Sequence, residues 1–291
     1  MNIIVGATGQ VGSNLIKEII ANGLPARAVI RDAGKLPQKN IEVRTADLFN
    51  PEQLTEAFKG GTTVFLLTPE NPASNDILGD TKQIVENYRK AIQATGIKKI
   101  VGLSSIGAQN DGNTGNLLMS KILEQGFDDL EATKIFIRPS YYFSNWLVYL
   151  ETVKQFGVLP TFFQEDLRLD MNSPVDVAKF IAKVITGSST SGNKDIYELV
   201  GPRKYSSLDV ATTFSKLLNK DVTVQCIPKQ QWKETFMSVG FTENTATNLS
   251  DTTQAVIDNK TVPERPIDAI KLPTTLEEYI DEQLKKQTTT R

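Results

Sequence analysis

The stretch that decides the fold is Gly6-Ala-Thr-Gly9-Gln-Val-Gly12, which directly follows the apolar run Ile3–Val5 and opens a helical pattern of apolar residues. In a dinucleotide-binding fold, glycines at this place permit a tight turn, let a pyrophosphate approach the backbone and let helix and strand pack closely. We therefore predict a dinucleotide site, formed by Gly6, Thr8, Gly9, Gln10, Val11 and Gly12. An ordinary glycine turn between a strand and a helix is the alternative.

Short apolar runs alternate with amphipathic helical patterns up to Ile185. The first six runs are Ile3–Val5, Ala26–Ile30, Ile41–Thr45, Thr63–Leu67, Lys99–Leu103 and Lys134–Ile137. Their Val, Ile and Leu content is typical of strands that are covered on both faces, and strands that alternate with helices form right-handed crossovers. The pattern predicts an α/β fold with a doubly wound parallel sheet of the Rossmann type and a smaller C-terminal α/β lobe.

The alternation becomes less regular after residue 150. We expect residues 1–187 to form the dinucleotide-binding domain, with its core in 1–150, residues 188–286 to form a smaller substrate lobe, and residues 287–291 to be a frayed tail. In this second part we expect strands near Ile196–Val200 and Val222–Ile227, and helices near Leu208–Leu218, Lys229–Val239 and Leu276–Lys285. The polar segment Gly187–Asn193 is predicted to be a loop.

The composition excludes several kinds of chemistry. The 291 residues include no histidine and one cysteine, and 32 basic residues nearly balance 34 acidic ones. Without imidazole there is no Ser-His-Asp triad and no His-ligated zinc, and we expect no metal site. Without a basic block we expect no direct contact with nucleic acid. The lone Cys226 lies in a run that alternates like a strand and is expected to be buried.

The sequence also bears on location. No apolar run approaches the roughly 18 residues of a membrane span. The first residues, Met1–Val5, are too short and uncharged for a signal peptide. We therefore expect a cytoplasmic protein that does not contact a membrane.

The end of the second expected strand bears on which dinucleotide is bound. Arg31 stands nineteen residues after Gly12, near the position where NAD-binding folds usually place an acidic residue for the ribose 2′-hydroxyl. A guanidinium instead suits a 2′-phosphate. NADP(H) is therefore the preferred cofactor. NAD(H) stays open because Asp32 follows directly, and a surface Arg-Asp pair without a role is a further alternative.

Several motifs together resemble a known family. Gly6–Gly12, Arg31, Thr45-Ala-Asp47-Leu, Leu67-Thr68-Pro69, Leu103-Ser104-Ser105 and Arg138-Pro139 occur in the order seen in atypical short-chain dehydrogenase/reductases. The chain resembles the NmrA-like branch, which includes NADPH:quinone oxidoreductases and NADP-sensing regulators. The resemblance covers nearly the whole chain and is strongest before residue 186.

The resemblance implies roles for residues at the strand ends. Asp47 would contact the adenine, and Leu67, Thr68 and Pro69 would lie beneath the nicotinamide ribose. Ser104 and Ser105 end the fifth strand in the same crevice, where either hydroxyl could contact a substrate oxygen or the cofactor. For Asp47 a plain polar loop residue is the alternative, and for the serines a helix cap or a turn hydrogen bond is equally open.

Lys121 matches one half of the Tyr-x-x-x-Lys pair of the wider family, in which the Lys holds the nicotinamide ribose and lowers the pKa of the Tyr. Leu117 stands at the tyrosine position. Alcohol dehydrogenase and sugar epimerase chemistry both need a positioned acid or base, so this departure counts against them. An exposed helical lysine is the alternative for Lys121.

A substitute acid could come from Tyr142, which with Tyr141 follows Arg138-Pro139 at the end of the sixth strand. Core packing of these aromatic residues is the alternative. Lys121, Tyr142 and Ser105 are thus the candidate catalytic residues.

Three functions follow from these features. The first is an oxidoreductase that passes a hydride from NADPH to a quinone-like or other small carbonyl substrate, a reaction that tolerates a missing acid because hydride transfer generates a stabilised anion. The second is a non-catalytic NADP(H) sensor that binds a regulatory protein partner. The third is a nucleoside-diphosphate-sugar epimerase or dehydratase, against which Leu117 counts. A homodimer also stays open.

Overall fold

A parallel sheet runs through the computed structural model, which describes residues 1–32, 41–187 and 194–289. Within these residues it has eight strands, in the spatial order β13 (Ile270–Lys271), β10 (Lys194–Val200), β6 (Thr133–Pro139), β5 (Lys99–Leu103), β4 (Thr63–Leu67), β1 (Asn2–Val5), β2 (Ala26–Ile30) and β3 (Glu42–Thr45). Every neighbouring pair is parallel. The predicted doubly wound parallel sheet is confirmed, and so are the first six expected strands.

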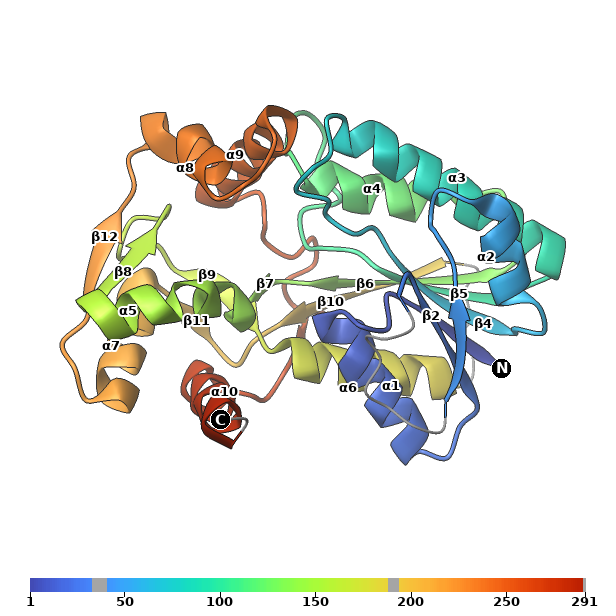
Figure 1. The fold of residues 1–291 in the computed structure, drawn as a ribbon, viewed down its shortest axis with the longest axis horizontal. Coiled ribbons are helices and arrows are strands. Elements are labelled where there is room, and N and C mark those ends of the chain that lie inside the picture. The colour runs from blue at the N-terminus through green and yellow to red at the C-terminus, as the bar shows by residue number, and fades with distance from the viewer. Residues whose placement is uncertain (33–40, 188–193, 290–291) are drawn as a thin grey trace.

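Helices cover both faces of this sheet (Figure 1). The helices on one face are α2 (Pro51–Phe58), α3 (Ile77–Thr95) and α4 (Leu117–Gln125), and those on the other are α1 (Gln10–Ala21) and α6 (Pro174–Thr186). Each face has its own apolar core, because the strands bury side chains in both directions. The sheet is therefore shielded from solvent on both sides, and ligands reach it at the ends of its strands.

The smaller lobe lies beyond the carboxyl end of β6, at the left of Figure 1. Its strands form a three-stranded sheet of β7 (Tyr141–Tyr142), β9 (Leu169–Asn172) and β11 (Lys204–Tyr205), and a pair of β8 (Val158–Thr161) and β12 (Thr223–Cys226). Its helical segments are η2 (Phe143–Tyr149), α5 (Leu150–Phe156), α7 (Ser207–Leu218), η3 (Lys229–Gln231), α8 (Trp232–Ser238), α9 (Glu243–Ile257) and α10 (Leu276–Thr289). A third apolar core, rich in aromatic side chains, holds the lobe together.

Part of the expected lobe belongs to the central sheet. The strand expected near Ile196–Val200 is β10, which pairs with β6 over six residues, and β13 pairs with β10 at the sheet edge. Conversely, η2, α5 and β8 pack in the lobe although they precede residue 188. The chain therefore crosses between the two parts several times. Assigning the Ile196–Val200 strand to the lobe was wrong, because β6 left an open parallel edge that this strand fills.

Two smaller expectations were also wrong. The tail expected to fray from residue 287 continues α10 to Thr289, where Gln287 accepts a hydrogen bond from Lys154 Nζ at 3.2 Å. Cys226 is exposed, because β12 pairs with β8 alone in a peripheral two-stranded sheet. Residues 188–193 of the expected polar loop, and residues 290–291, lie outside the described residues.

The glycine loop connects β1 to α1 at the point where the strand order reverses, between β1 and β4. Gly6 has φ +67°, a conformation that residues with a side chain rarely adopt. A Cβ on Gly12 would lie 2.2 Å from the Gly6 carbonyl oxygen, so α1 can approach β1 this closely only with glycine there. The start of α1 is thereby brought to the crevice that such a reversal creates.

Gly12→Ala should lower the free energy of unfolding by about 3 kcal/mol, the upper end of the usual cost of overpacking, because the added methyl meets main-chain atoms that cannot rotate away. Chemical denaturation measures the change. Gly23→Ala is the control, since its Cβ would meet nothing within 4 Å and the variant carries only the cost of its positive φ, about 1 kcal/mol. Equal losses for the two variants would contradict the tight contact.

Candidate functional site

A large cavity opens at the carboxyl ends of the parallel strands and extends into the smaller lobe. Its volume is about 1330 Å³. The segments that follow β1, β4, β5 and β6 line it, at residues 9–12, 67–70, 103–106 and 139–142. Ligands of open α/β sheets bind at this edge, where the strand order reverses.

The end of the cavity beside the glycine loop fits a pyrophosphate. Helix α1 begins at Gln10 after Gly9, and no side chain caps its first turn and no acidic residue lies in it. The amide groups of that turn therefore lack the usual partner and, together with the helix dipole, attract an anion. Gln10 Oε1 also accepts a hydrogen bond from Ser144 Oγ at 2.7 Å, which connects this end to the smaller lobe.

Most of the predicted cofactor residues meet at this cavity. Gly9, Gln10, Val11, Gly12, Leu67, Thr68, Pro69 and Ser104 line it. Gly6 lies directly behind them, where a Cβ would be 2.7 Å from Leu67 Cδ2. Thr8 is exposed on the loop and is not among the lining residues.

Arg31 and Asp47 follow neighbouring strands and are not among the residues that line the cavity. They follow β2 and β3, which pair up to Ile30 and Thr45, and both are exposed. The Asp47 carboxylate accepts the Phe49 N–H at 3.0 Å, so it also shapes its own turn. Their position at the carboxyl edge suits the adenosine half of a dinucleotide, and their contacts with it stay predictions.

Ser104 is already engaged by a buried charge network. Its hydroxyl donates to the Glu124 carboxylate, which in turn accepts hydrogen bonds from Arg138 Nε at 2.8 Å and Nη2 at 2.7 Å. Burial alone would lower the pKa of Arg138, but the hydrogen bonds and charges of the surrounding carboxylates raise it above its ordinary value. The Arg138 guanidinium stays charged and holds the Glu124 carboxylate in place. Because the Ser104 hydroxyl donates its one hydrogen to this carboxylate, it is not free to donate to a substrate.

The same network holds the segment around Glu264, which adjoins the cavity wall. Arg138 Nη1 donates to Glu264 at 3.0 Å, and the buried carboxylate of Glu198 accepts the backbone N–H groups of Glu264 and Arg265 at 2.9 and 3.1 Å. Val262, just before this point, lines the cavity. A buried guanidinium thus connects β6, α4 and β10 to a segment of the second half of the chain.

Lys121 is directed away from the cavity. Its Nζ pairs with the Asp111 carboxylate and donates to the Asn110 carbonyl oxygen at 3.0 Å, and Lys121 is not among the lining residues. The hydrogen bond and the charge of Lys121 lower the pKa of Asp111. Leu117, at the position of the missing tyrosine, does line the cavity. The role of Lys121 in ribose binding stays a prediction.

Tyr142 lies at the junction between the two halves of the cavity. Its hydroxyl is buried and has no hydrogen-bond partner among the described residues, and burial raises the pKa of the phenol above its ordinary value. The phenol is therefore a neutral donor without an acceptor, which is costly unless a bound molecule supplies one. Ser105 also lines the cavity, but its hydroxyl donates to the Ile106 carbonyl oxygen at 3.1 Å.

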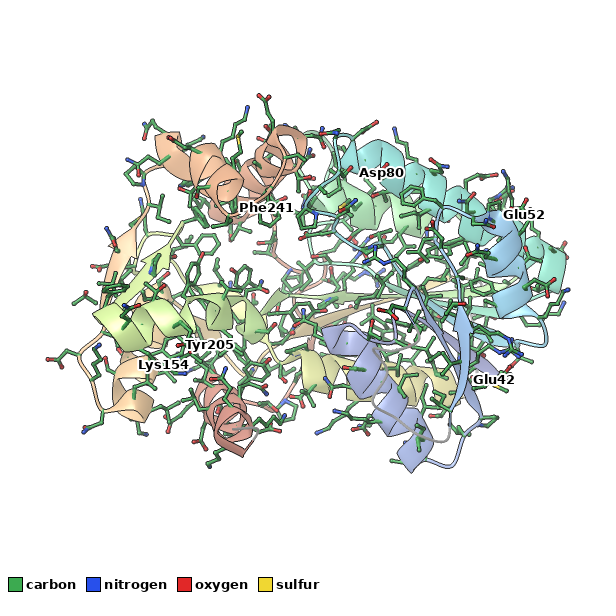
Figure 2. The ribbon with its side chains drawn as sticks, in the orientation of Figure 1. Glu42, Glu52, Asp80, Lys154, Tyr205 and Phe241 are labelled. Carbon is green, nitrogen blue, oxygen red and sulfur yellow. The ribbon has the colours of Figure 1, made fainter. Side chains whose placement is uncertain are left out.

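The smaller lobe contributes an aromatic wall that the sequence did not reveal. Phe162 and Phe236 line the cavity with ring centroids 4.7 Å apart, and Phe241 joins them at 6.1 Å from Phe236. Figure 2 shows Phe241 beneath α8 and α9. Phe162 is far from Phe236 and Phe241 in the sequence, so no local pattern indicates that they share one wall. Only the adjacent Phe162 and Phe163 indicate an aromatic surface in this region.

Two kinds of feature are absent from the part of the chain that the structure describes. In residues 1–32, 41–187 and 194–289 no helix is long and apolar enough to cross a membrane. The same residues hold no group of three or more His, Cys, Asp or Glu side chains that could bind a metal ion.

The sheet, the glycine loop and the crevice define a Rossmann-fold protein of the dinucleotide-binding class. Within that class the chain belongs to the NmrA-like family, whose sequence pattern matches residues 2–280.

Named relatives and a solved structure agree with this assignment. The chain is 25% identical to NAD(P)H azoreductase from Xenophilus azovorans over 257 residues, which cover 86% of this chain and 85% of the relative. It is 27% identical to quinone oxidoreductase 2 of Escherichia coli (strain K12) over 258 residues, which cover 86% of each. The crystal structure of an NADPH-dependent quinone oxidoreductase from E. coli with NADPH superposes with a TM-score of 0.78, at 23% identity, over 98% of this chain and 100% of that one.

Proposed function

We propose that this protein is an NADPH-dependent oxidoreductase that reduces a flat, conjugated carbonyl acceptor such as a quinone. The observation that carries the proposal is one continuous cavity that is lined by an uncapped glycine loop, by an aromatic wall and by Tyr142, whose buried hydroxyl has no hydrogen-bond partner among the described residues. The names of the azoreductase and quinone oxidoreductase relatives support the same class of reaction.

The residues at the nucleotide end would bind and orient the cofactor. The N–H groups at the start of α1 would hold the pyrophosphate, Arg31 the 2′-phosphate, Asp47 the adenine and Leu67–Pro69 the nicotinamide ribose. NADPH, when bound, supplies a hydride, that is, two electrons and one proton. NAD(H) can be bound in the same way, with loss of the Arg31 contact.

The residues at the junction would act on the acceptor. Addition of a hydride to a quinone leaves negative charge on oxygen. The Tyr142 hydroxyl, which is shielded from water in the structure, would turn toward that oxygen and donate a hydrogen bond to it until a proton neutralises it. Ser105 would give a second contact by turning away from the Ile106 carbonyl. Lys121 would reach the ribose by leaving Asp111, which is fully exposed, so this ion pair is weak.

The two parts of the chain would have different roles. Residues 1–187 would mainly hold the cofactor, and residues 188–286 would mainly shape the acceptor site. A cytoplasmic location, a homodimer and a regulatory protein partner stay predictions from the sequence.

The direct test combines cofactor titration with turnover. Trp146 and Trp232 fluorescence reports the binding of NADPH and NADH, and loss of the nicotinamide absorbance reports oxidation with a panel of benzoquinones and naphthoquinones. We expect tighter binding of NADPH than of NADH, and oxidation with naphthoquinones. Tight NADPH binding without oxidation by any quinone would contradict the reductase and favour the sensor.

Arg31→Ala should weaken NADPH binding by about 1.5–3 kcal/mol, the scale of a hydrogen bond to a charged group, and leave NADH binding unchanged. Tryptophan fluorescence titration measures both. Arg44→Ala is the control, because Arg44 is exposed on the neighbouring β3 and pairs with Glu42 at 2.8 Å. Equal losses for NADPH and NADH would exclude the 2′-phosphate contact.

Tyr142→Phe should lower kcat by about 100-fold, the lower end of the range for a lost proton donor, with NADPH binding unchanged. Steady-state rates with a naphthoquinone measure the change. Because burial raises the pKa of Tyr142, its phenol stays protonated as the pH rises, and the wild-type rate should show no loss from this group up to about pH 10, the ordinary value.

Tyr141→Phe is the matched control for this variant. Tyr141 also lines the cavity, but its hydroxyl is hydrogen-bonded to Asn145. Similar losses of kcat in the two variants would mean that the unpartnered hydroxyl has no special role.

A further inference from the structure

The far end of the cavity carries charge as well as aromatic rings. Arg168, Asp170 and Lys204 line it together with Phe162 and Phe236. Asp170 on β9 is the direct antiparallel partner of Lys204 on β11, and Arg168 immediately precedes β9. The small sheet of the lobe therefore brings three charged side chains to the acceptor half of the cavity.

The two cations of this group are its outermost members. The side chains of Arg168 and Lys204 are 57% and 48% exposed, whereas Asp170 is only 13% exposed. Asp209, which pairs with Arg168 at 3.2 Å, is 22% exposed and is not among the lining residues. Each cation is thus the more exposed partner of an ion pair with a less exposed acid, Lys204 with Asp170 at 3.5 Å and Arg168 with Asp209 at 3.2 Å.

Arg168 also has N–H groups that form no hydrogen bond within the described part of the chain. Both of its hydrogen bonds use Nη1, one to Asp209 at 3.2 Å and one to the Lys204 carbonyl oxygen at 3.4 Å. Neither Nε nor Nη2 is hydrogen-bonded to a residue in the described part of the chain. A guanidinium with a free edge matches the two oxygens of a carboxylate or sulfonate.

We propose that Arg168 and Lys204 form a subsite for an anionic substituent, a sulfonate or carboxylate, on a flat aromatic molecule whose rings lie against Phe162, Phe236 and Phe241. Where the bound molecule is reduced, this rests on the proposed function and defines its acceptor as an aromatic anion. Binding at the subsite does not depend on turnover.

A pair of fluorescent dyes tests binding without any reaction. 8-Anilino-1-naphthalenesulfonate and N-phenyl-1-naphthylamine share one ring system and differ by the sulfonate alone. The full-length protein, titrated with and without NADPH, should bind the sulfonated dye more tightly. Arg168→Ala should weaken the sulfonated dye by about threefold to tenfold, between the values for an exposed ion pair and a charged hydrogen bond, and spare the neutral dye.

Arg203→Ala is the matched control. Arg203 is as exposed as Arg168, at 56%, and reaches the same Asp209 at 3.5 Å, but it stacks over Tyr205 and does not line the cavity. It should leave both dyes unchanged. Equal binding of the two dyes by the wild type, or equal effects of Arg168→Ala and Arg203→Ala, would overturn the subsite.

Two further measurements keep the test decisive. Arg168→Lys retains the charge, so it should retain the preference for the sulfonated dye even if the alanine variant folds poorly; loss of the preference in the lysine variant, with the neutral dye still bound, would overturn the charge-based subsite. With 1,2-naphthoquinone-4-sulfonate and 1,2-naphthoquinone as acceptors, Arg168→Ala should raise KM for the sulfonated compound alone. No turnover with an intact dye preference would contradict the proposed function and leave the subsite standing, whereas turnover without a dye preference would overturn the subsite alone.

Discussion

The close packing of α1 against β1 is the constraint on which the site depends. Gly12 leaves no room for a side chain beside the Gly6 carbonyl oxygen, and Gly6 needs a positive φ to turn the chain. These two conditions bring an uncapped helix start to the place where the strand order reverses. The proposed binding of a dinucleotide phosphate would therefore be a consequence of how the first strand and helix are joined.

A second buried interaction connects this half of the molecule to the rest. Arg138, held by Glu124 and Glu198, joins β6 to α4 and β10 and fixes the segment near Glu264. A buried pair of this kind is costly to break from one side, because the remaining charge has no water to replace its partner. This network thereby ties the segment beside the cavity wall to the central sheet, and the aromatic wall of Phe162 and Phe236 belongs to the smaller lobe.

Local sequence patterns predicted the fold well, and they also predicted several of the residues that line the cavity. The glycine loop and the first six strands are set by residues close together in the sequence, so their spacing was informative. The engagement of Ser104 by Glu124, the strand β10 at the β6 edge and the wall of Phe162 with Phe236 all depend on residues that meet only after folding. Burial of the Tyr142 hydroxyl likewise comes from its surroundings, which a single sequence does not display.

We propose that one cavity holds the dinucleotide and the acceptor side by side. A crystal structure of the protein with NADP⁺ and a naphthoquinone would show both molecules in place. In that structure we expect the pyrophosphate on the glycine loop, the quinone ring against the nicotinamide at about 3–3.5 Å, the distance of a reactive complex, and a quinone oxygen hydrogen-bonded to Tyr142. A quinone bound outside the cavity, or a dinucleotide that leaves no space beside Tyr142, would contradict it.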